Sequence, residues 1–126
     1  MIKGTGVDIV EIDRIRSAVT KYGKKFLSRI FTPHEIKYCT AFNKLKYPEL
    51  SVRFAAKEAV FKALSQPGHY LSWQNVEILS AEDGRPMLIL SGEALKRAEE
   101  RGFKSLEISL SHSRENAVAV VMGFSE

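Results

Sequence analysis

The chain has 126 residues, of which 44% are hydrophobic and 27% charged, and its formal net charge is +4. These values are typical of one globular domain, so we expect a single domain over residues 1–126 and exclude disorder or a coiled coil for the whole chain. No apolar run approaches the roughly 18 residues of a membrane span. Acidic residues interrupt the start of the chain, which does not fit a secretory signal. We therefore expect a cytoplasmic protein that does not bind membranes.

The first predicted elements are a strand and a helix. Residues 5–12 (TGVDIVEI) are rich in β-branched side chains, which predicts a strand that Asp8 interrupts. Asp13 then suits the N-cap of a helix, and Gly23 would end it.

Two further helices follow in the first half of the chain. The segment from Thr32 to Glu35 has the form of a capping box with proline at the first helical position, which predicts a helix over about 33–43. Pro48 can open the next helix, predicted over about 49–65 from a long run of strong helix formers. Residues 66–68 (QPG) would stop it.

The second half of the chain consists mostly of predicted strands. Residues 73–80 and the segment MLILS flank a turn over 82–86, which predicts a hairpin. A short helix, EALKRAEERG, comes next. Apolar and polar residues then alternate over 106–112, and the apolar strand AVAVVMGF follows a polar turn at 113–116 to give a terminal hairpin. The pattern predicts an α+β fold with an antiparallel sheet.

The helix predicted over 49–65 carries charges where a buried helix should be apolar. At about 100° per residue, Lys57 falls in the middle of an apolar stripe, and alanines form a smooth opposite side that lets another backbone approach closely. Because a chain of this size has little interior, we expect part of this helix to pack against another subunit. The charges are either buried ion pairs, which add little stability, or groups retained for a ligand. The stripe consists of Leu50, Phe54, Lys57, Phe61 and Leu64, the alanines are Ala55, Ala56, Ala59 and Ala63, and the charges are Arg53, Lys57, Glu58 and Lys62.

Asp8 is costly within an apolar strand unless a positive group meets it; the alternative is a strand-end residue that faces water. If this strand lies beside the long helix, Asp8 and Glu58 converge among cations. Such a place suits a divalent cation that holds a phosphate, and Mg²⁺ fits best because it takes oxygen ligands and commonly uses one or two carboxylates. Zinc is disfavoured because Cys39 is the only cysteine and the three histidines are scattered. The residues thus predict a magnesium-dependent site for a polyphosphate ligand, without naming the reaction.

Two other features point to anionic ligands. His112 ends an alternating strand, where it could donate to a phosphate or cap the turn. The segment from Arg14 to Lys46 contains nine lysines and arginines opposed only by Glu35, which favours an anionic partner or, alternatively, a solvated face. Nucleic acid is disfavoured as that partner, because carboxylates sit among the cations and Phe54 lies on the buried stripe.

Three segments of the chain resemble a known family. Residues 6–15 (GVDIVEIDRI), 53–64 (RFAAKEAVFKAL) and 109–121 (SLSHSRENAVAVV) are similar, in order and spacing, to the signatures of the holo-acyl-carrier-protein synthases. The resemblance implies a phosphopantetheinyl transferase fold, with an antiparallel sheet packed against a long central helix. It also implies a homotrimer with active sites at subunit interfaces. The implied reaction is magnesium-dependent transfer of 4'-phosphopantetheine from coenzyme A to a serine of apo acyl carrier protein, which releases adenosine 3',5'-bisphosphate and supports fatty acid biosynthesis.

The resemblance also implies roles for individual residues. Asp8 and Glu58 match the magnesium ligands, and with Lys62 beside the transferred phosphate they form the catalytic group. The group that deprotonates the serine stays open and could be Asp8, Glu58 or a metal-bound water. The residues alone also allow a different magnesium-dependent phosphotransferase or a nucleotide hydrolase. Arg14 matches the surface that docks the acidic carrier protein. The positions that match the coenzyme A site are Arg53, Lys57, Lys62, the turn Gly84, Arg85 and Pro86 near the adenine, and His112 near the 3'-phosphate.

Overall fold

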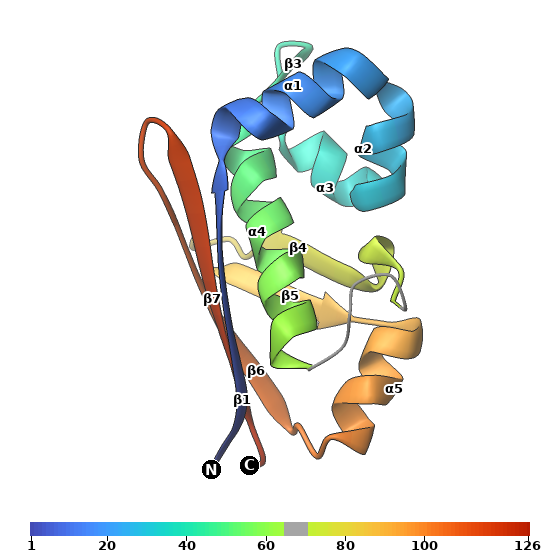
Figure 1. The fold of residues 1–126 in the computed structure, drawn as a ribbon, viewed down its shortest axis with the longest axis vertical. Coiled ribbons are helices and arrows are strands. Elements are labelled where there is room, and N and C mark those ends of the chain that lie inside the picture. Colours follow the sequence, from blue (N-terminus) through green and yellow to red (C-terminus); the bar gives the residue numbers. More distant parts are fainter. Residues whose placement is uncertain (65–70) are drawn as a thin grey trace.

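The computed structural model describes residues 1–64 and 71–126. A three-stranded antiparallel sheet, in the order β1-β7-β6, packs against the long helix α4 (Tyr47–Ala63) (Figure 1). The strands are β1 (Ile2–Glu11), β6 (Ser105–His112) and β7 (Asn116–Phe124). The predicted α+β fold is therefore confirmed, and so is the terminal hairpin.

Smaller elements surround α4. Three short helices gather at one end of it, and a two-stranded sheet, β4 with β5, packs on α4 and lies beside β6 at the edge of the large sheet (Figure 1). These elements are α1 (Ile12–Tyr22), α2 (Lys24–Ile30), α3 (Pro33–Tyr38), the two-residue strands β2 (Thr40–Ala41) and β3 (Lys44–Leu45), the 3₁₀ turn η2 (Trp73–Asn75), β4 (Val76–Ser80), β5 (Pro86–Leu90) and α5 (Gly92–Glu100). None of the helices in the described ranges is long and apolar enough to cross a membrane.

The N-terminal strand packs directly on the backbone of α4. A Cβ atom added at Gly6 would lie 1.9 Å from the carbonyl oxygen of Ala59, and one added at Gly4 would lie 2.6 Å from that of Ala63. No real Cβ atom tolerates such distances, so this packing requires glycine at both positions of the strand. The predicted close approach of a backbone to the alanine side of the helix is confirmed.

Strand periodicity decides which side chains of β1 meet α4. Asp8 lies two residues after Gly6 on the same strand and pairs with the fully buried Ala119 of β7. Because side chains alternate along a strand, Asp8 faces the helix as Gly6 does. The alternate residues Val7 and Ile9 face outward and are 55% and 66% exposed. On β7, Val120 and Met122 are exposed as well. The large sheet thus has one face covered by α4 and one apolar face open.

The expectation that part of α4 packs against another subunit stays a prediction, and much of its apolar stripe is already covered by this chain. Within the chain, the stripe residues Leu50, Phe61 and Leu64 are already 0–2% exposed. The apolar surface that stays exposed lies on the outer face of β1 and β7.

Helix boundaries differ from the sequence predictions in two places. Glu11, not Asp13, occupies the N-cap of α1 and makes no side-chain cap bond, while Asp13 pairs with Arg16. The capping box at Thr32 is confirmed, but α3 ends at Tyr38, because Phe42 and Asn43 adopt φ values of 52° and 63° in the turn between β2 and β3. The stop predicted for α4 at 66–68 lies outside the described residues.

Candidate active site

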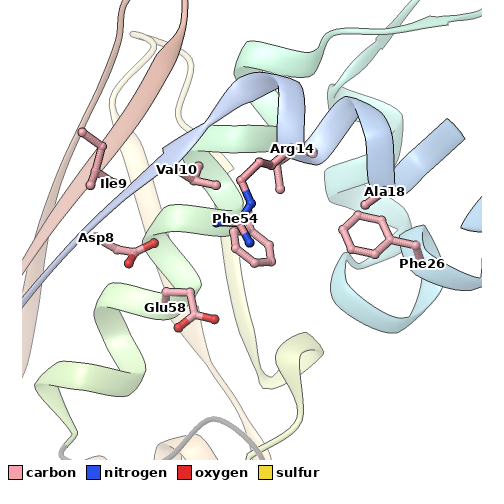
Figure 2. A pocket seen from close by; sticks show the side chains of 9 residues that line it. Asp8, Ile9, Val10, Arg14, Ala18, Phe26, Phe54 and Glu58 are labelled. Atoms are coloured by element: carbon pink, nitrogen blue, oxygen red, sulfur yellow. The ribbon is translucent and has the colours of Figure 1, made fainter. Parts of the chain in front are cut away.

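The carboxylates of β1 and α4 line one cavity. Asp8 and Glu58 belong to a cavity of about 370 Å³ between β1, α1 and α4. Figure 2 shows them together at one end of it, with Phe26 at the other. The hypothesis that the strand carrying Asp8 lies beside the helix carrying Glu58 is therefore confirmed.

A lysine connects this pair of elements. The ammonium of Lys62 donates hydrogen bonds to Asp8 Oδ1 at 3.1 Å and to the carbonyl oxygen of Val7 at 2.9 Å. The Lys62 side chain is 54% exposed and that of Asp8 18% exposed, so the cation approaches from solvent while the carboxylate is largely enclosed. Asp8 is thus not a strand-end residue facing water, which was the alternative left by the sequence.

Negative charge at this end of the cavity is incompletely balanced. Burial raises the pKa of the Glu58 carboxyl above its usual value, the Asp8 carboxylate raises it further, and Lys62 opposes both effects. An additional cation between the carboxylates would relieve this penalty. Mg²⁺ suits two carboxylates because it takes its remaining ligands from phosphate and water. Within the described residues, no group of three or more His, Cys, Asp or Glu side chains is placed to hold a metal ion.

The rest of this cavity is apolar with a basic rim. Val10, Ile15, Phe26 and Phe54 form the apolar wall, and Figure 2 shows the Arg14 side chain of α1 reaching toward Phe54. From the sequence, Phe54 was expected only on the buried stripe, and Phe26 had no predicted role. Phe54 is only half-buried, and its position one turn before Glu58 is the signal that could have assigned it to the site.

A second cavity contains most of the residues expected at coenzyme A. Its volume is about 200 Å³. The structure brings together Arg53, Gly84, Pro86 and His112 there, from α4, the β4–β5 turn and the end of β6. Arg85 of the same turn is exposed and does not line the cavity. The residues that sequence reasoning missed are Tyr38, Glu49, Val52, Ser80, Leu110 and Ser111.

The guanidinium of Arg53 is held by protein acceptors on α4 and β4. It donates to the carbonyl oxygens of Ile78 and Glu49, each at 3.1 Å, and to Ser80 Oγ at 3.2 Å. It also lies 4.5 Å from the centroid of the Tyr38 ring. His112 Nε2 is 3.8 Å from a carboxylate oxygen of Glu49, which pairs with Arg53 as well. Glu49 therefore lies between Arg53 and His112, the two side chains expected to contact a phosphate in this cavity.

Lys57 lies in neither cavity. Its side chain is fully buried, and its ammonium has three protein acceptors: Glu35 Oε1 at 2.9 Å and the carbonyl oxygens of Trp73 and Val76. Because an ammonium has three donors, none is left for a ligand. Burial lowers the pKa of Lys57, and Glu35 opposes that change. The structure therefore shows the buried ion pair that the sequence left as an alternative, and the predicted contact between Lys57 and coenzyme A has no geometric support.

Comparisons with known proteins give one consistent family for this chain. A family model described as the 4'-phosphopantetheinyl transferase superfamily matches residues 4–121. The chain is 49% identical over 118 residues to a holo-[acyl-carrier-protein] synthase of Dehalococcoides mccartyi, covering 94% of this chain and 95% of that protein. Among solved structures, it is similar to the Helicobacter pylori holo-[acyl-carrier-protein] synthase in complex with coenzyme A, with 36% identity, a TM-score of 0.82 and coverage of 95% and 99%. The Neisseria meningitidis synthase gives 33% identity, a TM-score of 0.86 and coverage of 98% and 99%.

Proposed function

The chain belongs to the 4'-phosphopantetheinyl transferase superfamily. We propose that it transfers the 4'-phosphopantetheine group of coenzyme A to a serine of apo acyl carrier protein, and that the reaction takes place beside its own Asp8 and Glu58. The chain is a transferase of this class, as its similarity to holo-[acyl-carrier-protein] synthases shows. The observation that carries the location is that the two carboxylates line one cavity beside the ammonium of Lys62.

The reaction joins the serine oxygen to the β-phosphate of coenzyme A and breaks the bond to adenosine 3',5'-bisphosphate. Such a transfer asks a protein chiefly for positioning and for stabilisation of charge on the phosphate oxygens. We propose that Asp8 and Glu58 hold Mg²⁺, which when bound supplies positive charge to those oxygens. Lys62 supplies a further positive charge from the solvent side, since its ammonium already lies 3.1 Å from Asp8.

The second cavity suits the nucleotide part of coenzyme A. In this proposal Arg53 provides positive charge to its phosphates, His112 donates a hydrogen bond to the 3'-phosphate, and the turn from Gly84 to Pro86 approaches the adenine. Arg53, Gly84, Pro86 and His112 already share the cavity in the free chain, which supports the grouping. Arg85 would contribute through its exposed side chain, and Lys57 would act from the interior and not by contact.

The carrier protein needs a separate surface. Arg14 lies on the exposed side of α1 at the rim of the Asp8 cavity, and it also lines a shallow depression with Lys21. This position lets an acidic carrier protein bind across α1 with its serine directed at Glu58. The role of this basic helix in docking is part of the proposal.

We further propose that three copies of the chain assemble through the outer face of the large sheet. That face exposes Val7, Ile9, Val120 and Met122, which is a costly surface for an isolated monomer. Ile9 also lines the Asp8 cavity, so a neighbour on this face would lie at the edge of the active site. The expected setting is the cytoplasm, in support of fatty acid biosynthesis.

Intact-mass spectrometry tests the proposed reaction. An apo acyl carrier protein is incubated with the chain and coenzyme A, first with Mg²⁺ and then with a chelator. We expect the carrier to gain the mass of phosphopantetheine only when the metal is present, and Asp8→Asn to abolish the gain. Full transfer in the chelator, or by Asp8→Asn, would refute the proposed metal site while leaving the transferase activity in place.

A further inference from the structure

The buried pair of Lys57 and Glu35 joins three parts of the chain. Lys57 comes from the middle of α4 and Glu35 from α3, and both side chains are 0% exposed. The second carboxylate oxygen of Glu35 accepts a hydrogen bond from the backbone N–H of Ile78 in β4 at 2.8 Å. One ion pair thus connects two helices and the first strand of the small sheet.

The same ammonium holds the segment that precedes β4. Lys57 Nζ donates to the carbonyl oxygen of Trp73 at 3.1 Å and to that of Val76. These two carbonyls bracket η2, so one side chain fixes both ends of this short turn against α4. The Gln74 side chain donates from within the turn to the carbonyl oxygen of Phe31 at 2.9 Å, which anchors its other side.

The clamped turn carries an aromatic ring that supports the proposed active site. The Trp73 ring stacks on Phe54, with centroids 5.3 Å apart and planes 20° from parallel, and meets Phe61 edge-on at 5.2 Å. Phe54 in turn is part of the wall of the cavity that contains Glu58. A continuous set of contacts therefore runs from the Lys57 ammonium through Trp73 to the wall of the cavity.

We propose that Lys57, paired with Glu35, is a positioning residue for the transfer reaction. It clamps residues 73–76 onto α4 and so holds Trp73 against Phe54, which sets the shape of the cavity beside Asp8 and Glu58. The inference rests on the proposed location of the reaction. It gives Lys57 a role in the reaction without contact to either substrate.

Stability alone is a weak reason for this arrangement. Desolvation of two buried charges offsets most of their attraction. A pair of apolar residues of similar size often stabilises a fold as much as a buried ion pair does. A buried ammonium differs from an apolar side chain in its directed donors, here aimed at Trp73, Val76 and Glu35. Those directions fix a backbone geometry, which apolar packing alone fixes less sharply.

The single tryptophan allows the clamp to be observed directly. Trp73 is the only tryptophan in the chain, so fluorescence excited at the red edge of tryptophan absorption reports on this ring alone. In Lys57→Met, we expect the emission to move to longer wavelength and acrylamide quenching to increase in the free protein. We also expect kcat/KM for transfer to fall roughly ten- to a hundredfold through kcat, as for reacting groups that are slightly misplaced.

Leu50→Ala is the matched control for lost stability. Leu50 is a fully buried residue of α4 that lines neither cavity. This variant should melt at a lower temperature yet keep the parental tryptophan emission and kcat when it is assayed below its melting point. If Lys57→Met behaves in the same way, the pair is only structural and the proposal is wrong.

Two further substitutions keep the test informative if Lys57→Met does not fold. Trp73→Phe retains a stacking ring and should keep kcat near the parental value, whereas Trp73→Ala should lose it to the extent expected for Lys57→Met. Equal activity of both variants would overturn the proposal. Failure of the proposed active site can be told apart from failure of the Lys57 proposal. If the reaction takes place elsewhere, Glu58→Gln remains active while the Trp73 emission of Lys57→Met still shifts.

Discussion

Lys62 and Asp8 are 54 positions apart in the sequence, yet the lysine ammonium donates a hydrogen bond of 3.1 Å to the aspartate carboxylate. The bond bridges β1 and α4 next to Glu58, which faces the same cavity. One lysine thus accompanies two carboxylates, and burial and Asp8 together raise the pKa of Glu58. The site retains a destabilising charge that a stability-optimised core would lack, as expected where a cation and a phosphate are to bind.

The first prediction concerns Glu58→Gln, which should abolish phosphopantetheine transfer while leaving the fold intact. The amide keeps the size of the side chain but removes the charge that would hold Mg²⁺. Transfer is measured by the mass of the carrier protein, and the fold by circular dichroism. Glu100→Gln, at an exposed position at the end of α5, is the matched control and should remain fully active. Transfer at the parental rate by Glu58→Gln would remove this residue from the site.

The same variant should be more stable than the parent protein at neutral pH when a chelator is present. A raised pKa means that the folded state binds the Glu58 proton more tightly than the unfolded state does, so the free energy of unfolding falls as the pH rises through that range. Glutamine removes this loss, and its advantage should disappear as the pH falls toward the ordinary glutamate range. Thermal melts at several pH values check this, and a constant or reversed difference would contradict it.

A second prediction concerns the packing that brings Asp8 to the helix. Gly6→Ala should destabilise the fold at the upper end of the roughly 1–3 kcal/mol typical of overpacking. The added Cβ would meet backbone and not a movable side chain, at 1.9 Å from the carbonyl oxygen of Ala59. Denaturant unfolding gives the magnitude. Thr5→Ala on the exposed side of the same strand should change stability by about 0.5 kcal/mol or less, and equal effects would show that β1 moves off α4 freely.

The sequence was informative where a local pattern implied a specific partner. The alanine side of α4 predicted that another backbone approaches closely. The structure shows that this backbone is β1, and the contact brings Asp8 to Glu58. Lys57 was visible as a charge in an apolar stripe, but its partner lies on another helix. The sequence placed Glu35 at the N3 position of a capping box, since local patterns show the cap and not the long-range pair.

The end of α3 shows a second limit of local reasoning. The sequence predicts a helix to about 43, whereas a two-residue turn forms at Phe42 and Asn43. Turns of this kind usually contain glycine, and asparagine followed by lysine gives a weak signal. The bond from Lys46 N–H to the carbonyl oxygen of Cys39 at 2.7 Å closes the hairpin, so a contact between the two short strands decides where the helix ends.

A third prediction concerns Cys39, which is fully buried at the end of α3. Burial raises the pKa of its thiol to about 11, from an ordinary value of 9.0. The folded state therefore holds the proton more tightly, and the thiol should cost stability as the pH rises from 9 toward 11, by about 2 kcal/mol at the upper limit. Cys39→Ala should remove this part of the pH dependence. The free energy of unfolding is measured against pH for the parent protein and for Cys39→Ala. Identical slopes between pH 9 and 11 would show that ionisation of Cys39 does not destabilise the folded state.

A fourth prediction concerns the nucleotide cavity. His112→Ala should raise the KM for coenzyme A roughly tenfold, the loss expected for a hydrogen bond to a charged group. With dephospho-coenzyme A, which lacks the 3'-phosphate, the parent and the variant should have similar KM values. His34→Ala, at an exposed histidine that does not line this cavity, is the control and should leave both values unchanged. An equal rise of KM for both substrates would place His112 away from the 3'-phosphate.

The final prediction concerns assembly through the outer sheet face. Met122 lies on β7 beside Thr5 of β1, is 38% exposed and lines neither cavity. Met122→Glu would bury a charge at any contact between copies, where desolvation is costly. Light scattering should show a trimer for the parent and a monomer for the variant, with unchanged circular dichroism, while Lys96→Glu on the exposed side of α5 should stay trimeric. Because Ile9 of the same face lines the Asp8 cavity, the monomer should also lose transfer activity. A parent that is monomeric at working concentration, or a monomeric variant with full activity, would show that each chain carries a complete site.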